Sequence, residues 1–362
     1  MKATTTIKPF VSCVSLAGVL LYSALLLFSC SKEEGPGNKP DPDEKEQQYQ
    51  TDIYVAGYES NGRVLMPKCW KNGVPIDLEV GSQGAELYAM TVDGEDIYLA
   101  GYTWDSKGWD RIAMYWKNGK AVELIKGRAY AIAVENGDVY AAGTHNIDPV
   151  YWKNEKLITL RDVPGNEYVA GIAVNGSDVH TVIRRFPGPS NISEIGSILY
   201  SKNGGVLHTL SANGVAFAMA LDGNDVYVVG TEWNGSNSVA KYWKNGNAVA
   251  LSNKSANTIA TAITVDRGDV YIAGTETVLG EYSIAKYWKN GIAVALDPGE
   301  YDGAYAGGIA VDGDDVYVAG RVWTAGSKSK AGYWKNGTLV TLTDENESVD
   351  AVSIVVVKTP VE

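Results

Sequence analysis

Beyond residue 50 the chain alternates short apolar runs with polar turns. One such unit recurs over about residues 51–357. Its signature is Asp-(Ile/Val)-Tyr-x-Ala-Gly, followed downstream by Tyr-Trp-Lys-Asn-Gly or a relative of it. Successive signature Asp residues are 44, 42, 40, 47, 44 and 46 residues apart. A period in the forties without helical periodicity is typical of β-propeller blades. The signature occurs at Asp52–Gly57, Asp96–Gly101, Asp138–Gly143, Asp225–Gly230, Asp269–Gly274 and Asp315–Gly320, with a degenerate copy at Asp178–Ile183.

Each unit predicts four short strands. The first is small and apolar, as in Tyr130–Val134, and the second is the Asp-Val-Tyr-Val-Ala-Gly signature itself. The third and fourth are exemplified by Ala285–Lys289 and Ile292–Leu296, with Asn-Gly between them. Asn-Gly predicts a type I′ hairpin, because both residues tolerate the positive φ that this turn needs. The repeated Trp of the third strand is expected to pack between neighbouring units.

The two ends of the repeat region predict a closed ring. The chain enters at a second strand, with Asp52, and ends with an extra first strand over residues 351–356. Pairing of this extra strand with the first unit would leave no exposed sheet edge at the junction. We therefore expect one all-β, seven-bladed β-propeller over residues 51–357, with four antiparallel strands per blade and a tail at 358–362.

The repeat resembles bacterial extracellular propeller repeats of the kelch-like and HAF type. They share a Trp followed by a short Asn/Gly turn, which is the Tyr-Trp-Lys-Asn-Gly pattern here, and the resemblance covers about residues 51–357. It implies the fold but no activity, because propellers carry enzymes, scaffolds and lectins alike.

The N-terminus predicts a targeting segment. Lys2 and Lys8 precede an apolar run, Leu16–Phe28, which is too short to span a bilayer. Leu-Phe-Ser-Cys at residues 27–30 resembles the bacterial lipobox, which implies a signal peptide at 1–29 and acylation of Cys30. The alternative is an ordinary secretory signal that happens to contain a cysteine.

Residues 30–50 are rich in Pro, Gly and charge and predict a flexible acidic tether. Ser-Lys-Glu-Glu directly after Cys30 resembles the surface-export signal of Bacteroidetes lipoproteins. We expect a cell-envelope protein whose lipid anchors it to the outer membrane, facing outward.

Composition narrows the chemistry. The chain of 362 residues is 45% hydrophobic with a net charge of −12, which argues against disorder and against nucleic acid as a partner. Its three His lack metal-ligand spacing, and Cys69 is the only cysteine beyond the signal and Cys30. The Asp-Gly turns are too dispersed to converge on a calcium ion. We therefore expect no metal and no cofactor, and we assign no catalytic residue.

The loops differ between the two ends of the predicted blades. Three residues separate the first and second strands in every internal unit, and Lys-Asn-Gly usually joins the third to the fourth. The gap from the Gly that closes the second strand to the Tyr of Tyr-Trp-Lys varies instead from 7 to 16 residues. Variable loops on a rigid scaffold are the usual place for a binding site. We call the two sides the constant-turn end and the variable-loop end.

Aromatic residues outside the repeat pattern gather in the variable loops. Such rings beside polar neighbours are typical of sugar-binding surfaces, and Trp and Tyr also anchor protein partners. The alternative is that the rings pack over the loops or between blades. The candidate ligand-binding residues are Tyr58, Trp104, Trp109, Trp233, Tyr282 and Trp323, joined by Arg184 and Arg185 of the longest loop, which could hold a carboxylate such as that of a uronic acid or be solvated.

These features favour a non-catalytic binding module, with a polysaccharide or glycoconjugate as ligand. A scaffold for other envelope proteins is the alternative. A second alternative is a glycan-active enzyme with carboxylates at the propeller axis, because Glu86, Glu167 and Asp350 each stand just before a first strand. Catalysis is left open on the sequence alone, with the balance against it.

Overall fold

The computed structural model describes residues 49–60, 64–81, 83–160, 167–186, 196–252, 256–277, 282–326, 328–343 and 348–361. Within these ranges every regular element is a β-strand. The described residues therefore contain no helix that is long and apolar enough to cross a membrane. The expected signal peptide, Cys30 and all but the last two residues of the tether lie outside the described residues. Those two, Tyr49 and Gln50, already belong to the first strand.

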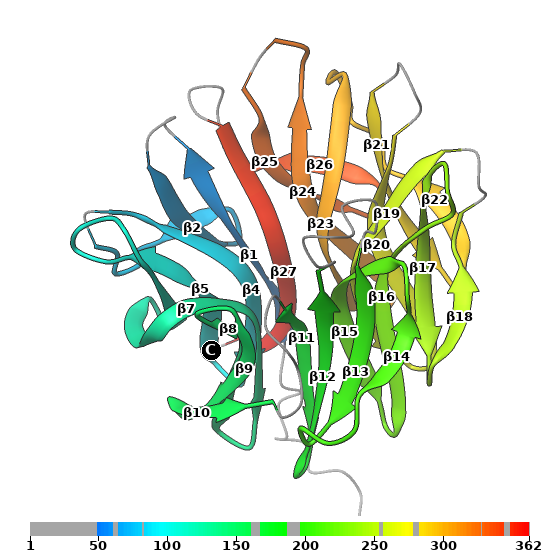
Figure 1. Ribbon diagram of the computed structural model, residues 1–362. Helices are drawn as coiled ribbons and strands as arrows, with labels where there is room; N and C mark the ends of the chain where they lie inside the picture. The colour runs from blue at the N-terminus through cyan, green and yellow to red at the C-terminus, as the bar shows by residue number, and fades with distance from the viewer. Residues whose placement is uncertain are drawn as a thin grey trace, which may run out of the picture. The chain divides into compact units, whose positions relative to one another are not determined.

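The described strands form six antiparallel sheets (Figure 1). Five have four strands, in the orders β27-β1-β2-β3, β11-β12-β13-β14, β15-β16-β17-β18, β19-β20-β21-β22 and β23-β24-β25-β26, and the sixth has seven, β10-β9-β8-β7-β6-β5-β4. The strands are β1 Tyr49–Ser60, β2 Leu65–Lys71, β3 Val74–Ile76, β4 Ala85–Asp93, β5 Asp96–Trp104, β6 Arg111–Lys117, β7 Lys120–Glu135, β8 Asp138–His145, β9 Asp148–Lys153, β10 Lys156–Thr159, β11 Glu167–Asn175, β12 Asp178–Arg185, β13 Ser197–Lys202, β14 His208–Ser211, β15 Gly214–Asp222, β16 Asp225–Trp233, β17 Ser238–Lys244, β18 Asn247–Ala250, β19 Asn257–Asp266, β20 Asp269–Thr277, β21 Ser283–Lys289, β22 Ile292–Ala295, β23 Gly303–Asp312, β24 Asp315–Trp323, β25 Lys330–Lys335, β26 Thr338–Thr341 and β27 Ser348–Pro360.

The seven-stranded sheet arises because β7 takes part in two pairings. Its first half pairs with β6 as far as Lys126, and its second half pairs with β8 from Gly127 onward. The strand is therefore the fourth strand of one repeat unit and the first strand of the next. The predicted order of first, second, third and fourth strand recurs on both sides of it.

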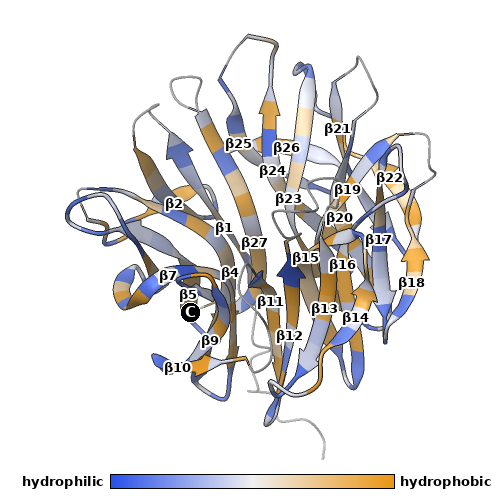
Figure 2. Cartoon of the chain, in the orientation of Figure 1, coloured by the Kyte–Doolittle hydropathy of each residue, from blue (hydrophilic) through white to orange (hydrophobic). Residues whose placement is uncertain are grey.

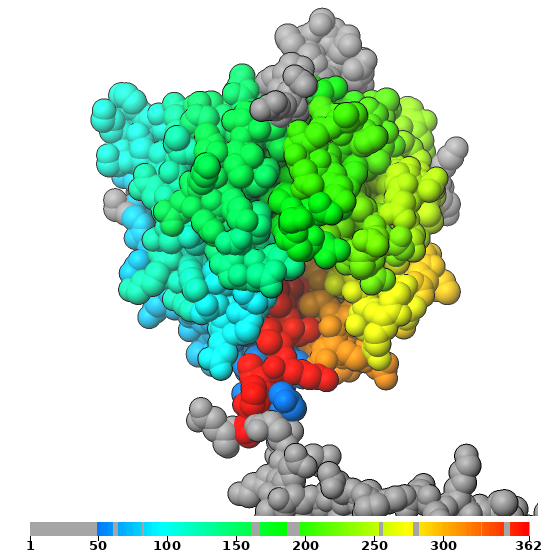
Figure 3. Space-filling view, turned by 90° about the horizontal axis from the view of Figure 1, so that it is seen from below, coloured from blue at the N-terminus to red at the C-terminus, as the bar shows by residue number. Residues whose placement is uncertain are grey.

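The C-terminal strand pairs with the N-terminal one, as the repeat predicts. β27 runs antiparallel to β1 from Tyr49↔Pro360 to Ser60↔Ser348, and it is the first strand of that sheet. Figure 3 shows the C-terminal residues at the surface beside the N-terminal part of the sheet. The pairing reaches two residues before the expected boundary at 51 and three beyond the one at 357.

The first strands of the units lie innermost. Each contacts the first strand of the next unit in the order β4, β7, β11, β15, β19 and β23, then β27, and β27 in turn contacts β4. A cavity of about 460 Å³ runs between them and is lined by residues of all these strands. None of the side chains that line it carries a charge.

Every first strand carries a β-bulge at the same place. The extra residue lies opposite the last residue of the second-strand signature, which is usually Gly. At Gly101 there is no room for a side chain, because a Cβ would lie 2.0 Å from the carbonyl oxygen of Glu86. In β12 the degenerate signature places Ile183 at this point. All the bulged residues line the central cavity: Tyr88, Tyr130, Ala170, Phe217, Thr261, Gly307 and Val352.

The turns at the constant-turn end follow the predicted chemistry. Asn72 has a φ of 51° and Gly73 one of 81°, and the equivalent pairs repeat these positive values. The turn between first and second strands is shorter than expected, with two residues rather than three. The strand extends one residue further because the residue before the turn pairs across it, as in Asp93↔Asp96.

The repeated Trp residues form the core between units, as predicted. Trp116 of β6 is fully buried and belongs to one apolar cluster with Ala56 and Cys69 of the preceding unit. Trp334 packs in the same way against Ala273 and its neighbours. Burial also raises the pKa of the Cys69 thiol to about 12, which fits a packed cysteine rather than a nucleophile.

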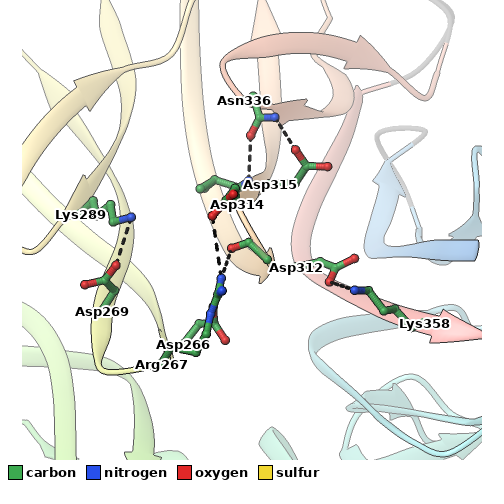
Figure 4. A network of polar contacts seen from close by, with 11 residues as sticks. Asp266, Arg267, Asp269, Lys289, Asp312, Asp314, Asp315, Asn336 and Lys358 are labelled. Carbon is green, nitrogen blue, oxygen red and sulfur yellow. Dashed lines mark hydrogen bonds and ion pairs between the residues drawn. The ribbon is translucent and has the colours of Figure 1, made fainter. Parts of the chain in front are cut away.

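The repeated Asp, Lys and Asn form one polar network per unit at the constant-turn end. Asn336 Nδ2 donates to Asp315 Oδ1 over 2.7 Å, and Lys335 Nζ lies 2.9 Å from the other carboxylate oxygen. The Asn336 Oδ1 accepts the backbone N–H of Val316 at 2.8 Å. Figure 4 shows the Asn336–Asp315 contact beside the Lys289–Asp269 pair of the neighbouring unit. The signature residues are therefore structural.

Candidate functional site

The variable-loop end holds all the predicted ligand-binding residues, but they differ in exposure. Trp104, Trp233 and Trp323 end β5, β16 and β24 and are each partly buried. Trp109 is 78% exposed and Tyr282 is 51% exposed. Of the predicted rings, these two are therefore the ones most open to a partner.

Neighbouring residues cover part of the Trp104 and Trp323 rings. The Arg111 guanidinium carbon lies 4.3 Å from the Trp104 ring centre, and the Tyr102 ring meets Trp104 edge-on at 5.6 Å. The Trp323 ring covers the backbone of Gly303, where a Cβ would lie 2.5 Å from the indole. Packing thus accounts for part of the surface of Trp104 and Trp323, which was the alternative considered for these rings.

A continuous row of rings follows the mouth of the central cavity, and we call it the aromatic row. It consists of Trp104, Tyr102, Tyr88, Tyr130, Tyr168 and Phe186, which come from three successive repeat units. Centroid separations along the row are 5.6, 6.1, 4.9, 4.6 and 5.6 Å, within the usual range for interacting aromatic pairs. The bulges of β4 and β7 bring Tyr88 and Tyr130 into it.

Three arginines lie against the aromatic row. Arg111 and Arg128 sit 5.5 and 5.6 Å from the centre of the same ring, that of Tyr102. Arg128 Nη1 lies 3.1 Å from the hydroxyl of Tyr130. Arg184 Nη1 likewise lies 3.2 Å from the hydroxyl of Tyr168. The row and its arginines form one connected surface at the variable-loop end.

Arg184 and Arg185 do not act as the pair that their adjacency suggests. Neighbouring residues of a strand point to opposite faces. Arg184 lies over the Phe186 ring at 4.7 Å, whereas Arg185 forms an ion pair with its cross-strand partner Glu167. Arg185 therefore already has its carboxylate within the protein.

The three acids expected near the axis do not line the cavity, and each is engaged by a neighbouring side chain. Glu86 accepts a hydrogen bond of 2.6 Å from the Tyr102 hydroxyl, and Arg321 Nη1 lies 2.5 Å from both oxygens of Asp350. Tyr58 also contacts Asp350, and burial together with this carboxylate raises the pKa of its hydroxyl. Burial raises the pKa of Glu167 in spite of its ion pair.

A small pocket of about 140 Å³ lies beside the aromatic row. Its walls come from Trp109 and Arg111 on one side and Arg128 and Asn146 on the other. Lys126 also lines it, and its charge is compensated by Asp110 at 2.8 Å. The pocket therefore joins the most exposed predicted Trp to two of the arginines.

Sequence reasoning missed Arg111, Arg128 and the tyrosines of the aromatic row. The available signal was the bulky ring at the same place in the first strands of two successive units, Tyr88 and Tyr130. The described residues contain no group of three or more His, Cys, Asp or Glu side chains that could hold a metal ion.

No family model matches the chain, and no curated protein matches it. A puromycin-hydrolysing peptidase of Mycobacterium tuberculosis is 14% identical, with a TM-score of 0.50 over 73% of this chain and 46% of its own. An acylaminoacyl peptidase of Pyrococcus horikoshii is 15% identical, with a TM-score of 0.50 over 82% and 51%. A TolB-like protein of Agrobacterium tumefaciens is 10% identical, with a TM-score of 0.40 over 87% and 100%.

The chain spans about half the length of the two peptidases. At such low identity, a likeness to them concerns the fold alone. Together with the repeated four-stranded antiparallel sheets, it identifies the chain as a β-propeller-type protein.

Proposed function

We propose that the chain is a seven-bladed β-propeller that acts as a non-catalytic binding module for a polysaccharide or glycoconjugate, through its variable-loop end. The blade count is supported by the cycle of contacts from β4 through β27 back to β4. It is also supported by β7, which serves two units, and by the β1–β27 pairing that joins the termini.

The observation that carries the binding proposal is the aromatic row together with the pocket beside it. Aromatic rings stack on the apolar faces of pyranoses, while neighbouring polar groups bind the hydroxyls. Trp109 offers an exposed ring, and Arg111 and Asn146 supply hydrogen-bond donors within the same pocket. A ligand that extends beyond this pocket meets the tyrosines of the row.

We further propose that the propeller is held at the bacterial outer membrane, facing outward, by a lipid on Cys30 and the tether that follows. Support comes from the lipobox-like residues 27–30 and from the charged, Pro-rich composition of residues 30–48. An anchored module would present the variable loops to glycans at the cell surface. Metabolic labelling with radioactive palmitate tests the proposed lipid anchor. The wild-type protein should incorporate the label, and the Cys30→Ala variant should not.

The binding proposal is tested with the full chain in detergent. Its thermal unfolding is followed against a panel of bacterial, plant and host polysaccharides. A ligand that binds only the folded state raises the unfolding midpoint by mass action. We expect at least one glycan to raise it by a few degrees, and Trp109→Ala to abolish that shift while leaving the unliganded midpoint within a degree or two.

The matched control is Ile292→Ala. Ile292 is 73% exposed on β22, one of the apolar outermost strands seen in Figure 2, and follows an Asn-Gly turn at the constant-turn end. This variant should retain the glycan shift. A panel that raises no midpoint, or an equal loss of the shift in both variants, would overturn the proposal.

A further inference from the structure

The charges at the variable-loop end are unbalanced in one place. The chain as a whole is acidic, with 43 Asp and Glu against 31 Lys and Arg. Of the six arginines in the ranges that the structure describes, Arg185, Arg267 and Arg321 pair with carboxylates. The other three, Arg111, Arg128 and Arg184, lie on the aromatic row and have no carboxylate partner within those ranges.

Two of these arginines converge on one point. Arg111 begins β6 and Arg128 lies in the second half of β7, yet both guanidinium groups approach the Tyr102 ring and both line the pocket beside Trp109. The Nε of Arg111 is buried and has no hydrogen-bond partner among the described residues. A buried donor without a partner costs free energy unless something supplies an acceptor.

Stacking determines which part of each guanidinium is available. An arginine over an aromatic ring uses the face of its guanidinium, and its N–H groups remain directed in the plane. Two guanidinium groups that line one pocket supply positive charge and several N–H donors, which suit the oxygens of a carboxylate or a sulfate. Lys126 adds no free charge there, because Asp110 compensates it.

We propose that the pocket lined by Trp109, Arg111 and Arg128 binds an acidic sugar unit. Its carboxylate or sulfate lies between the two guanidinium groups, and its ring stacks on Trp109. This inference rests on the proposed glycan-binding function and adds the charge of the ligand to it. It also replaces the Arg184–Arg185 pair as the anion site, because Glu167 already occupies Arg185.

The test compares acidic ligands with neutral ligands that have the same sugar backbone. Calorimetry with the full chain in detergent measures binding of oligogalacturonate and of its fully methyl-esterified form, with dextran sulfate and dextran as the sulfated pair. The acidic member should bind about tenfold tighter or more, because hydrogen bonds between two charged groups are stronger than those to a neutral group. Added salt should reduce that preference. A larger preference in one pair identifies the acidic group as carboxylate or sulfate.

The variants are Arg111→Gln and Arg128→Gln, with Arg267→Gln as the matched control. Arg267 lies at the constant-turn end, where it pairs with Asp266. Each of these two variants should reduce binding of the acidic ligand by about tenfold and reduce binding of its neutral counterpart much less, whereas the control should change neither. The thermal midpoint of each variant shows that it is folded.

Three results overturn the inference. Neutral and acidic ligands that bind equally well would remove the charge preference while the glycan-binding function stands. If the preference for the acidic ligand persists in both Arg111→Gln and Arg128→Gln, the acidic group binds elsewhere. Absence of binding by these four ligands and by the wider panel would remove the proposed function as well.

Discussion

At the constant-turn end each signature Asp contacts the Lys and Asn of its own unit, whereas at the variable-loop end Arg111 and Arg128 contact rings and no carboxylate within the described residues. Within the described residues, the same scaffold therefore carries repeated Asp–Lys–Asn networks at one end and, at the other, arginines without a carboxylate partner beside ion pairs such as Arg185–Glu167. The comparison separates residues that repeat because they build the blade from residues that do not repeat and are open to a ligand. Repetition in the sequence thus indicated the architecture, and departure from the repeat indicated the candidate site.

The largest effect is expected in the core between units. Trp116→Ala empties a fully buried position, so we expect a loss of about 3–5 kcal/mol in the free energy of unfolding. Urea denaturation measures it. Trp109→Ala, which replaces an exposed Trp of a variable loop, should change the free energy of unfolding by no more than about 0.5 kcal/mol. Similar losses in the two variants would remove the distinction between repeated and loop tryptophans.

A smaller effect is expected in one Asp–Lys–Asn network. Asn118 has a φ of 50°, donates to Asp96 and accepts the backbone N–H of Ile97. Asn118→Ala should lower the free energy of unfolding by about 1–2 kcal/mol, because it loses both hydrogen bonds and strains the turn. Asn118→Gly keeps the turn and should lose less. Equal losses would assign the effect to the side-chain contacts alone.

The smallest effect is expected in the pH dependence of a single network. Hydrogen bonds from Lys335 and Asn336 hold the pKa of Asp315 below its ordinary value. A carboxylate with a lowered folded-state pKa stabilises the protein above its unfolded pKa, and this contribution is lost as the pH falls through the folded value. The urea midpoints of wild type and Asp315→Asn should therefore converge between about pH 5 and pH 2. A gap that stays constant over that range would contradict it.

Much of the fold could be predicted because its signals are local. Alternating apolar runs and Asn-Gly pairs predict strands and turns from residues that are close together in the sequence, and the regular period shows that the unit repeats. The β1–β27 pairing followed from counting the strands. The positions of the bulges could not be predicted. They depend on how the first strands pack around the axis, and the closing Gly shows only that a backbone approaches closely there.

The candidate site was predicted only at the level of which end carries it. Trp109 and Tyr282 are open, as a binding residue must be, whereas Trp104 and Trp323 are partly covered by neighbours that no spacing in the sequence indicates. Glu86, Glu167 and Asp350 do not line the cavity, and each is engaged by a neighbouring side chain. Tyr102 and Arg185 face Glu86 and Glu167 across paired strands, whereas Arg321, the partner of Asp350, comes from β24 of the neighbouring sheet.

By itself the sequence determined the repeat unit, its four strands, the turn chemistry and the buried role of the repeated Trp, because each depends on residues close together in the chain. Only the tertiary structure decided which charges remain without a partner. Arg111 and Arg128 approach one ring and one pocket because two repeat units pack side by side. Whether a charge is compensated depends on distances across that packing, and the sequence does not contain those distances.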